Sequence, residues 1–162
     1  MRPIEFTCEA EFSIPPEELA EGILDLARWP EFDGYGPLPG IRSAEFLVHT
    51  PDIIGTRIRV TNRDGSTHVE EIREWDPHRH VSLHMDSFVL PLSRLATHFE
   101  ESWHFERRDK TTYVKRTFKL HPTNRFAQVA LWLISRLFRR AVNRHFQKMG
   151  DRSGTEALNE KT

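Results

Sequence analysis

The sequence predicts an α+β domain in which a seven-stranded, curved antiparallel sheet packs against one long C-terminal helix. Residues 4–14 alternate strictly between apolar and polar side chains, as a half-buried strand does. Six more strand-like segments follow as far as residue 121. Residues 124–149 instead repeat apolar side chains at steps of three and four, which is typical of an amphipathic helix.

The first strand, residues 4–14, places Cys8 on its apolar side, so we expect this cysteine to be a small core residue. Pro15 and Pro16 end the strand and can open a helix, because proline is tolerated in a first helical turn. The following acidic residues suit the positive end of the helix dipole. We expect a second short helical piece over residues 26–32 and then a turn-rich connection.

The six remaining strands are expected to form a meander joined by turns rich in Asp, Gly and Pro. Their predicted ranges are 41–49, 55–61, 67–75, 80–85, 94–106 and 111–121. The inward face of strand 67–75 stays open, because a shift of one residue exchanges its two faces. We favour the face with Val69, Glu71 and Trp75, which adds Glu71 to the interior, over the face with His68, Glu70 and Ile72.

The final helix carries an apolar stripe that we expect to lie against the sheet. The stripe consists of Phe126, Ala130, Leu133, Leu137 and Ala141, and it is widened by Ile134, Phe138 and Val142. Gly150 is expected to end the helix. The sequence therefore predicts a single domain over residues 1–150 and a polar, disordered tail over residues 151–162.

Composition and charge indicate an ordinary globular protein. The chain has 162 residues, 29% charged side chains, a formal net charge of −1 and one cysteine. With no export signal and no apolar run long enough to span a bilayer, we expect a cytoplasmic protein. Residues 110–150 carry bases but no acids. Neutralisation by the acidic first strand is the favoured explanation, and a basic face for an anionic partner is the alternative.

Several short motifs together resemble a known family. They are Ile-Pro-Pro-Glu-Glu at 14–18, Trp-Pro-Glu-Phe at 29–32, Pro-Gly-Ile-Arg-Ser at 39–43, Glu-Glu-Ile-Arg-Glu-Trp-Asp-Pro at 70–77, and Glu-Ser-Trp-His-Phe-Glu at 101–106. With the final helix, they make residues 4–149 resemble the START-like (SRPBCC) superfamily, the polyketide cyclase/dehydrase and lipid-transport group. The resemblance implies a helix-grip fold with a cavity between the sheet and the long helix. These motifs belong to turns and core, so the resemblance implies no specific reaction.

Glu101 and Arg116 lie on the apolar faces of their strands and are the best candidates for polar site residues. If Glu106 pairs with Thr111 across the last hairpin, Glu101 lies directly opposite Arg116. Because an unpaired buried charge is very costly, we expect the two side chains to form an ion pair. They are also the best catalytic candidates, although a carboxylate paired with arginine is a poor base.

The favoured function is binding of a small, mainly hydrophobic or aromatic molecule in this cavity. The expected ligand-binding residues are Ile58, Val60, Glu71, Phe88, Leu90, Phe99, Glu101, Trp103, Arg116, Phe118, Phe126, Ala130, Leu133 and Leu137. The resemblance also permits a cyclase or dehydratase acting in the same cavity. A third alternative is a membrane- or protein-interaction module that uses the arginine-rich side of the final helix.

The sequence contains no glycine-rich phosphate loop and no Gly-x-Ser-x-Gly motif. The histidines lack a His-x-x-x-His or Cys-x-x-Cys spacing, so we expect surface histidines and no metal site. We also expect neither a cofactor nor a nucleic-acid partner. The oligomeric state stays open.

Overall fold

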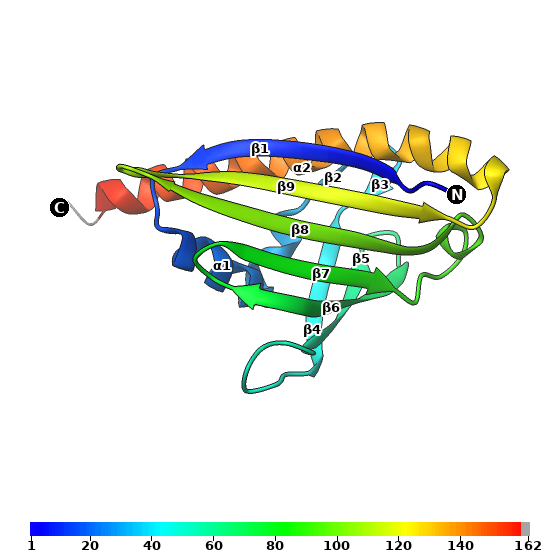
Figure 1. Cartoon of the computed structure of the whole chain (residues 1–162), viewed down its shortest axis with the longest axis horizontal. Helices are drawn as coiled ribbons and strands as arrows, with labels where there is room; N and C mark the ends of the chain where they lie inside the picture. The colour runs from blue at the N-terminus through cyan, green and yellow to red at the C-terminus, as the bar shows by residue number, and fades with distance from the viewer. Residues whose placement is uncertain (160–162) are drawn as a thin grey trace.

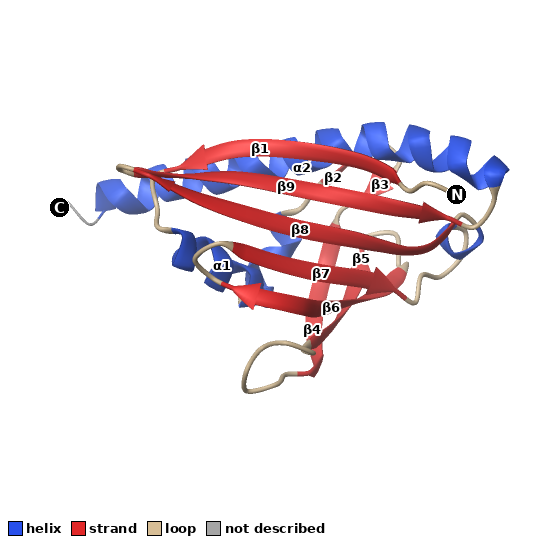
Figure 2. Cartoon of the chain, viewed as in Figure 1, coloured by secondary structure: helices blue, strands red, loops and turns tan. Residues whose placement is uncertain are grey.

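In the computed structural model, residues 1–159 are described, with side chains as far as residue 154. Seven strands form one antiparallel sheet in the order β1-β9-β8-β7-β6-β5-β4 (Figures 1 and 2). They are β1 (Ile4–Phe12), β4 (Ile41–Val48), β5 (Arg57–Asn62), β6 (Thr67–Asp76), β7 (His80–Asp86), β8 (Ala96–Arg108) and β9 (Thr111–Pro122). The sheet has the order expected of a helix-grip fold, which confirms the predicted fold class.

The remaining elements cover one face of this sheet. Between β1 and β4 lie α1 (Pro16–Leu24), the 3-10 helix η1 (Leu26–Glu31), and a small hairpin of β2 (Gly34–Tyr35) and β3 (Leu38–Pro39). A second 3-10 helix, η2 (Leu92–Arg94), precedes β8, and α2 (Arg125–Asn159) closes the fold. Figure 1 shows α2 running alongside β1 and β9. The core lies between this helix and the concave face of the sheet.

The charge asymmetry of the sequence is partly explained by the pairing of β1 with β9. Glu5 lies opposite Lys119, and Glu9 lies opposite Lys115. Opposite charges at directly facing positions on a sheet attract each other. The acidic first strand therefore lies beside the basic end of the chain, as the favoured explanation expects, with opposite charges facing each other at these two positions.

The favoured face of β6 is wrong for most of the strand. Glu70 and Ile72 are buried, whereas Glu71 is partly exposed and contacts Arg57 and Arg73. A β-bulge between Ile72 and Glu74 then shifts the alternation by one residue, so Trp75 again packs on the core. A bulge inserts one extra residue and exchanges the two faces of the strand beyond it.

The predicted register of the last hairpin is also wrong by two residues. Arg108, not Glu106, lies opposite Thr111, so the turn contains only Asp109 and Lys110. Trp103 therefore lies opposite Arg116, and Glu101 opposite Phe118. Because the shift is an even number of residues, every side chain keeps the face that the sequence predicts.

The long helix differs from its prediction at both ends. Asn124 caps its start, since Asn124 Oδ1 accepts a hydrogen bond of 2.8 Å from the backbone N–H of Ala127. The helix does not end at Gly150 but continues to Asn159, and residues 160–162 of the expected tail lie outside the described residues. An ion pair between Arg152 and Glu31 of η1 holds the part beyond Gly150 against the domain.

The first half of α2 also presents a different face to the core from the one expected. The residues that pack inward are Ala127, Leu131, Ser135 and Phe138, followed by Ala141, Val142 and Phe146. By contrast, Phe126 is 91% exposed and Leu133 is 56% exposed. The apolar stripe of the helix is wider than the surface that the sheet covers, and tertiary contacts bury the side of the stripe that carries Ala127. No helix among residues 1–159 is long and apolar enough to cross a bilayer.

Candidate functional site

A cavity of about 760 Å³ lies between the concave face of the sheet and the helices. The sheet, α1, η1, α2 and the loop between β7 and β8 all contribute to its wall. Most of the lining side chains are apolar, including Leu19, Ile23, Trp29, Phe32, Leu83, Met85, Phe99, Trp103, Phe118, Ile134, Leu137, Phe138 and Met149. A cavity of this size and character is typical of small-molecule sites.

Eight of the expected ligand-binding residues line this cavity. They are Phe88, Leu90, Phe99, Glu101, Trp103, Arg116, Phe118 and Leu137. The rest do not. Ile58 and Val60 are fully buried in the sheet outside the lining, and Phe126, Ala130 and Leu133 lie off the wall because α2 turns its Ala127 side inward. Glu70 lines the cavity in place of Glu71, because β6 turns Glu70 and Ile72 inward before its bulge.

The predicted ion pair between Glu101 and Arg116 is confirmed. Arg116 Nε donates to Glu101 Oε1, and the two residues are 8% and 3% exposed. The pair forms diagonally across β8 and β9, since Glu101 faces Phe118 in register. The guanidinium carbon of Arg116 also lies 4.3 Å from the centre of the Trp103 ring, and this cation–π contact further holds its plane.

His145 joins this pair from α2 and was missed by the sequence reasoning. Its Nδ1 lies 3.3 Å from Arg116 Nη1, so the ring accepts a hydrogen bond from the guanidinium. Burial, followed by the positive charge of Arg116, lowers the pKa of His145 to about 3. The signal in the sequence was its position four residues after Ala141 and seven after Phe138 on the inward stripe.

Glu70 and His68 bring a second acidic group to the same wall. His68 Nε2 lies 3.0 Å from Glu70 Oε1, and both side chains line the cavity. Burial raises the pKa of Glu101, and the carboxylate of Glu70 adds to this effect, while Arg116 opposes it. Glu70 and Glu101 are the two buried carboxyl groups that the described residues contribute to the wall, and the raised pKa of Glu101 favours its protonated form.

The loop between β7 and β8 closes one part of the wall with exposed apolar groups. Leu90 is 60% exposed although it also lines the cavity, and Val89 is exposed beside it. Phe88 turns inward, with its ring 4.7 Å from that of Phe99. Side chains that contact both the cavity and the solvent mark the loop as an entrance to the cavity.

The site can hold an apolar body and recognise one polar group on it. Arg116 offers N–H donors beyond those used by Glu101, and a protonated carboxyl group would offer an O–H donor. The site can also supply an acid, because the raised pKa of Glu101 favours a carboxyl proton. Among the described residues, no serine or threonine of the wall forms a hydrogen bond to a histidine, as an activated nucleophile would.

Structural comparisons return proteins with the same fold at low sequence identity. A protein from Thermus thermophilus, TTHA0849, is 18% identical with a TM-score of 0.70, over 94% of this chain and 99% of that one. The Zhui aromatase/cyclase from Streptomyces sp. R1128 is 11% identical with a TM-score of 0.70, over 96% of each chain. The major latex-like protein 151 from Panax ginseng is 13% identical with a TM-score of 0.66, over 93% of this chain and 99% of that one.

At these identities the structural likeness establishes the fold. No curated protein matches the sequence significantly. The sequence model of one family, described as polyketide cyclase / dehydrase and lipid transport, matches residues 3–153. That match spans nearly the whole chain and agrees with the sheet order and the cavity, so this protein belongs to the polyketide cyclase / dehydrase and lipid transport family.

Proposed function

We propose that this protein binds a small, mainly apolar molecule in the cavity and holds a polar group of that molecule at Arg116. The observation that carries the proposal is a cavity of about 760 Å³ whose apolar wall contains one buried Glu101–Arg116 pair. An apolar wall supplies affinity through burial, and a few fixed polar groups supply orientation. An oxygen acceptor such as a carbonyl or carboxylate on an aromatic or aliphatic skeleton fits this pattern.

The proposal is tested by filling the cavity from one wall. Leu137 lines the cavity, whereas Leu133, one turn earlier on α2, is exposed. The apolar fluorophore N-phenyl-1-naphthylamine should bind the wild type and the Leu133→Trp variant alike. Leu137→Trp should weaken binding at least tenfold, about 1.4 kcal/mol, because the indole occupies the space. Equal affinity of both variants would overturn the proposal.

Native mass spectrometry of protein purified from its own host identifies the ligand class directly. A retained small molecule with a polar acceptor should leave Arg116→Met more readily than the wild type. Retention of only fully apolar molecules, unaffected by Arg116→Met, would contradict the role of Arg116 in orientation.

An enzymatic role in the same cavity is a second candidate, and the raised pKa of Glu101 favours it. A carboxyl group with a raised pKa is a stronger candidate for protonating a leaving hydroxyl group, as a cyclase or dehydratase step requires. Glu101→Gln keeps the shape of the side chain but removes its acid. Loss of turnover of a hydroxylated polyketide-like substrate, with unchanged binding of that substrate, would support catalysis. Unchanged turnover would exclude Glu101 as the acid.

Peripheral membrane contact through α2 is a third candidate, favoured by a mixed apolar and basic surface. Phe126, Val129 and Leu133 are exposed near the start of the helix. Arg125, Trp132 and Arg136 follow one another on the same outward side, with Arg136 placed 4.7 Å above the Trp132 ring. This combination suits the surface of an anionic bilayer. Further along the helix, Arg140 and Arg144 instead lie over Tyr35 of the domain itself.

A further inference from the structure

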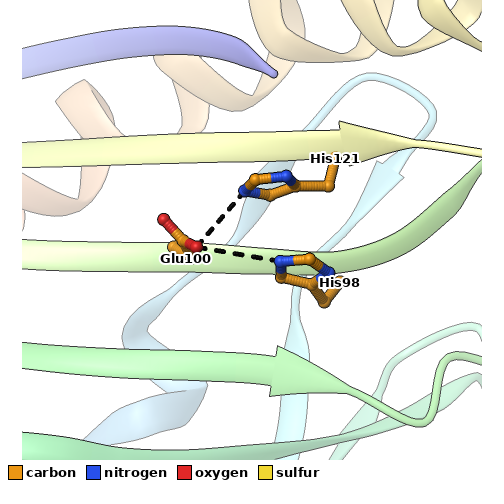
Figure 3. Close-up of side chains that lie close together, drawn as sticks. All are labelled: His98, Glu100 and His121. Carbon is orange, nitrogen blue, oxygen red and sulfur yellow. Dashed lines mark ion pairs between the residues drawn. The ribbon is translucent and has the colours of Figure 1, made fainter. Parts of the chain in front are cut away.

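The outer face of the sheet, away from the cavity, carries a group of side chains that the proposed function does not use. His98 and Glu100 come from β8, and His121 comes from the facing position on β9 (Figure 3). One ligand atom from each residue lies within 4.8 Å of the other two. Strand neighbours at positions i and i+2, joined by a cross-strand partner, lie together on one face of a sheet.

The Glu100 carboxylate approaches both imidazoles without forming an aligned hydrogen bond to either. Glu100 Oε1 lies 3.3 Å from His121 Nε2 and 3.7 Å from His98 Nε2. His121 Nε2 is enclosed, and its contact with Glu100 Oε1 is an ion pair without the alignment of a hydrogen bond. An enclosed nitrogen without an aligned partner is uncommon in proteins.

Thr97 Oγ1 forms a hydrogen bond of 3.0 Å with His98 Nδ1 and also lies 3.4 Å from the backbone carbonyl oxygen of His121. When the Thr97 hydroxyl donates to that carbonyl, it accepts from His98 Nδ1. In this tautomer His98 turns the lone pair of Nε2 toward the Glu100 oxygen. A lone pair facing a carboxylate oxygen is unfavourable unless a cation lies between them. A hydrogen bond to the second ring nitrogen is also the usual way in which a protein orients a metal-binding histidine.

We propose that His98, Glu100 and His121 bind a divalent transition-metal ion of the zinc class, with water at the fourth position. In a tetrahedral zinc site with bonds of about 2.0–2.2 Å, neighbouring ligand atoms are about 3.3 Å apart. The separations of 3.3 Å and 3.7 Å from Glu100 Oε1 match this spacing. The imidazole rings stack with their centres 4.0 Å apart and an interplanar angle of 16°, so the rings must turn out of this stack to direct both nitrogens at one ion.

The metal would join the beginning of β8 to the end of β9. These two ends lead directly into the loop at the cavity entrance and into the start of α2, respectively. Thr123 Oγ1 already donates to the carbonyl of Arg94 at 2.6 Å across the same junction. Metal binding is therefore expected to stabilise the folded state by an amount that rises with the logarithm of the metal concentration above the Kd, because only the folded chain holds the three ligands together.

The same face offers a matched control. His80 and His104 are also neighbours, with their ring centres 4.4 Å apart and their planes tilted by 36°, and Glu74 pairs with His80. In that group, however, His80 Nε2 is already hydrogen-bonded to Glu74 Oε2 at 2.5 Å. His104→Gln therefore removes a paired histidine of the same face without changing the proposed ligands.

The test is a calorimetric titration of the full chain with ZnCl₂, combined with the melting temperature at each zinc concentration. The wild type and His104→Gln should each bind one equivalent of zinc and show the same rise in melting temperature. His98→Gln, Glu100→Gln and His121→Gln should each lose this binding, while their metal-free melting temperatures show that they fold. Thr97→Val, which removes only the orienting hydroxyl, should weaken binding about 10- to 100-fold.

Cobalt(II) provides a second readout that depends on geometry. In the wild type it should give the intense visible bands of a four-coordinate ion, and these should be absent in His121→Gln. Equal weakening by His104→Gln and His121→Gln, or binding below one equivalent in the wild type, would overturn the site. Because the cavity lies on the other face, N-phenyl-1-naphthylamine binding should persist in these variants, so failure of one proposal does not imply failure of the other.

Discussion

Arg116 and Glu101 form their ion pair across a diagonal of the sheet, and this diagonal leaves Arg116 directly opposite Trp103. The guanidinium consequently has a carboxylate on one side, an indole ring against one face and the His145 ring beyond it. A planar cation held by three partners presents its remaining N–H groups in a fixed direction. This arrangement is the basis of the first two predictions.

Breaking the buried pair should be costly, and removing both partners should be less so. Arg116→Met leaves a buried carboxyl group without its cation and should lower the free energy of unfolding by about 3–5 kcal/mol. The double variant Arg116→Met/Glu101→Leu should recover most of that loss. Urea denaturation of the four members of the cycle measures both effects. Strictly additive single losses would contradict a direct interaction.

His145 should make the stability of the protein fall in acid. Burial lowers its pKa to about 3 in the folded chain, whereas an unfolded histidine titrates near 6.5. Between these values the unfolded chain binds a proton that the folded chain does not, so folding stability decreases as pH falls from 6.5 toward 3. The slope from this residue is at most about 1.4 kcal/mol per pH unit.

The His145→Gln variant lacks the imidazole, so its folding stability should depend less on pH than that of the wild type. Denaturant unfolding of both between pH 4 and 7 should show a shallower pH dependence in the variant. His49→Gln, in an exposed position, serves as the control and should follow the wild type. Parallel curves for the wild type and His145→Gln would show that this imidazole titrates normally.

We expect the exposed side of α2 to bind anionic lipid surfaces. The wild type should co-sediment with phosphatidylserine-containing vesicles more than with vesicles of phosphatidylcholine alone, because the arginines add electrostatic attraction. Phe126→Ser/Leu133→Ser should reduce this binding. The control variant Phe46→Ser/Ile54→Ser alters exposed apolar residues at the β4–β5 end and should leave vesicle binding unchanged. Equal binding to both vesicle types would count against membrane contact.

Asn124 should stabilise the start of α2 as its N-cap. Asn124→Ala removes the acceptor for the Ala127 N–H and should lower the free energy of unfolding by about 1 kcal/mol. Asn143→Ala, on the exposed side of the same helix, should be neutral or slightly stabilising because alanine has the higher helix propensity. Thermal unfolding followed by circular dichroism compares the two. A similar change in both variants would rule out a capping role.

The sequence by itself determined the fold class, the strand faces other than that of β6, and the inward positions of Glu101 and Arg116. These features depend on the periodicity of apolar residues within each segment, which can be read without knowing how the segments pack together. It determined less about the site, since the first half of the expected stripe of α2 and the expected Glu71 lie off the cavity wall, whereas Leu137 of the same stripe lines it. The stripe was broad enough to be buried on either of two sides, and only contact with the sheet selected one.

Tertiary structure alone decided the remaining features. The bulge in β6 exchanged Glu71 for Glu70 inside the cavity, and a hairpin turn two residues shorter than expected made the ion pair diagonal. The approach of His145 to Arg116, and of His121 to Glu100, joins residues 29 and 21 positions apart in the chain. Such contacts depend on register and packing between distant elements, and periodicity carries no information about them.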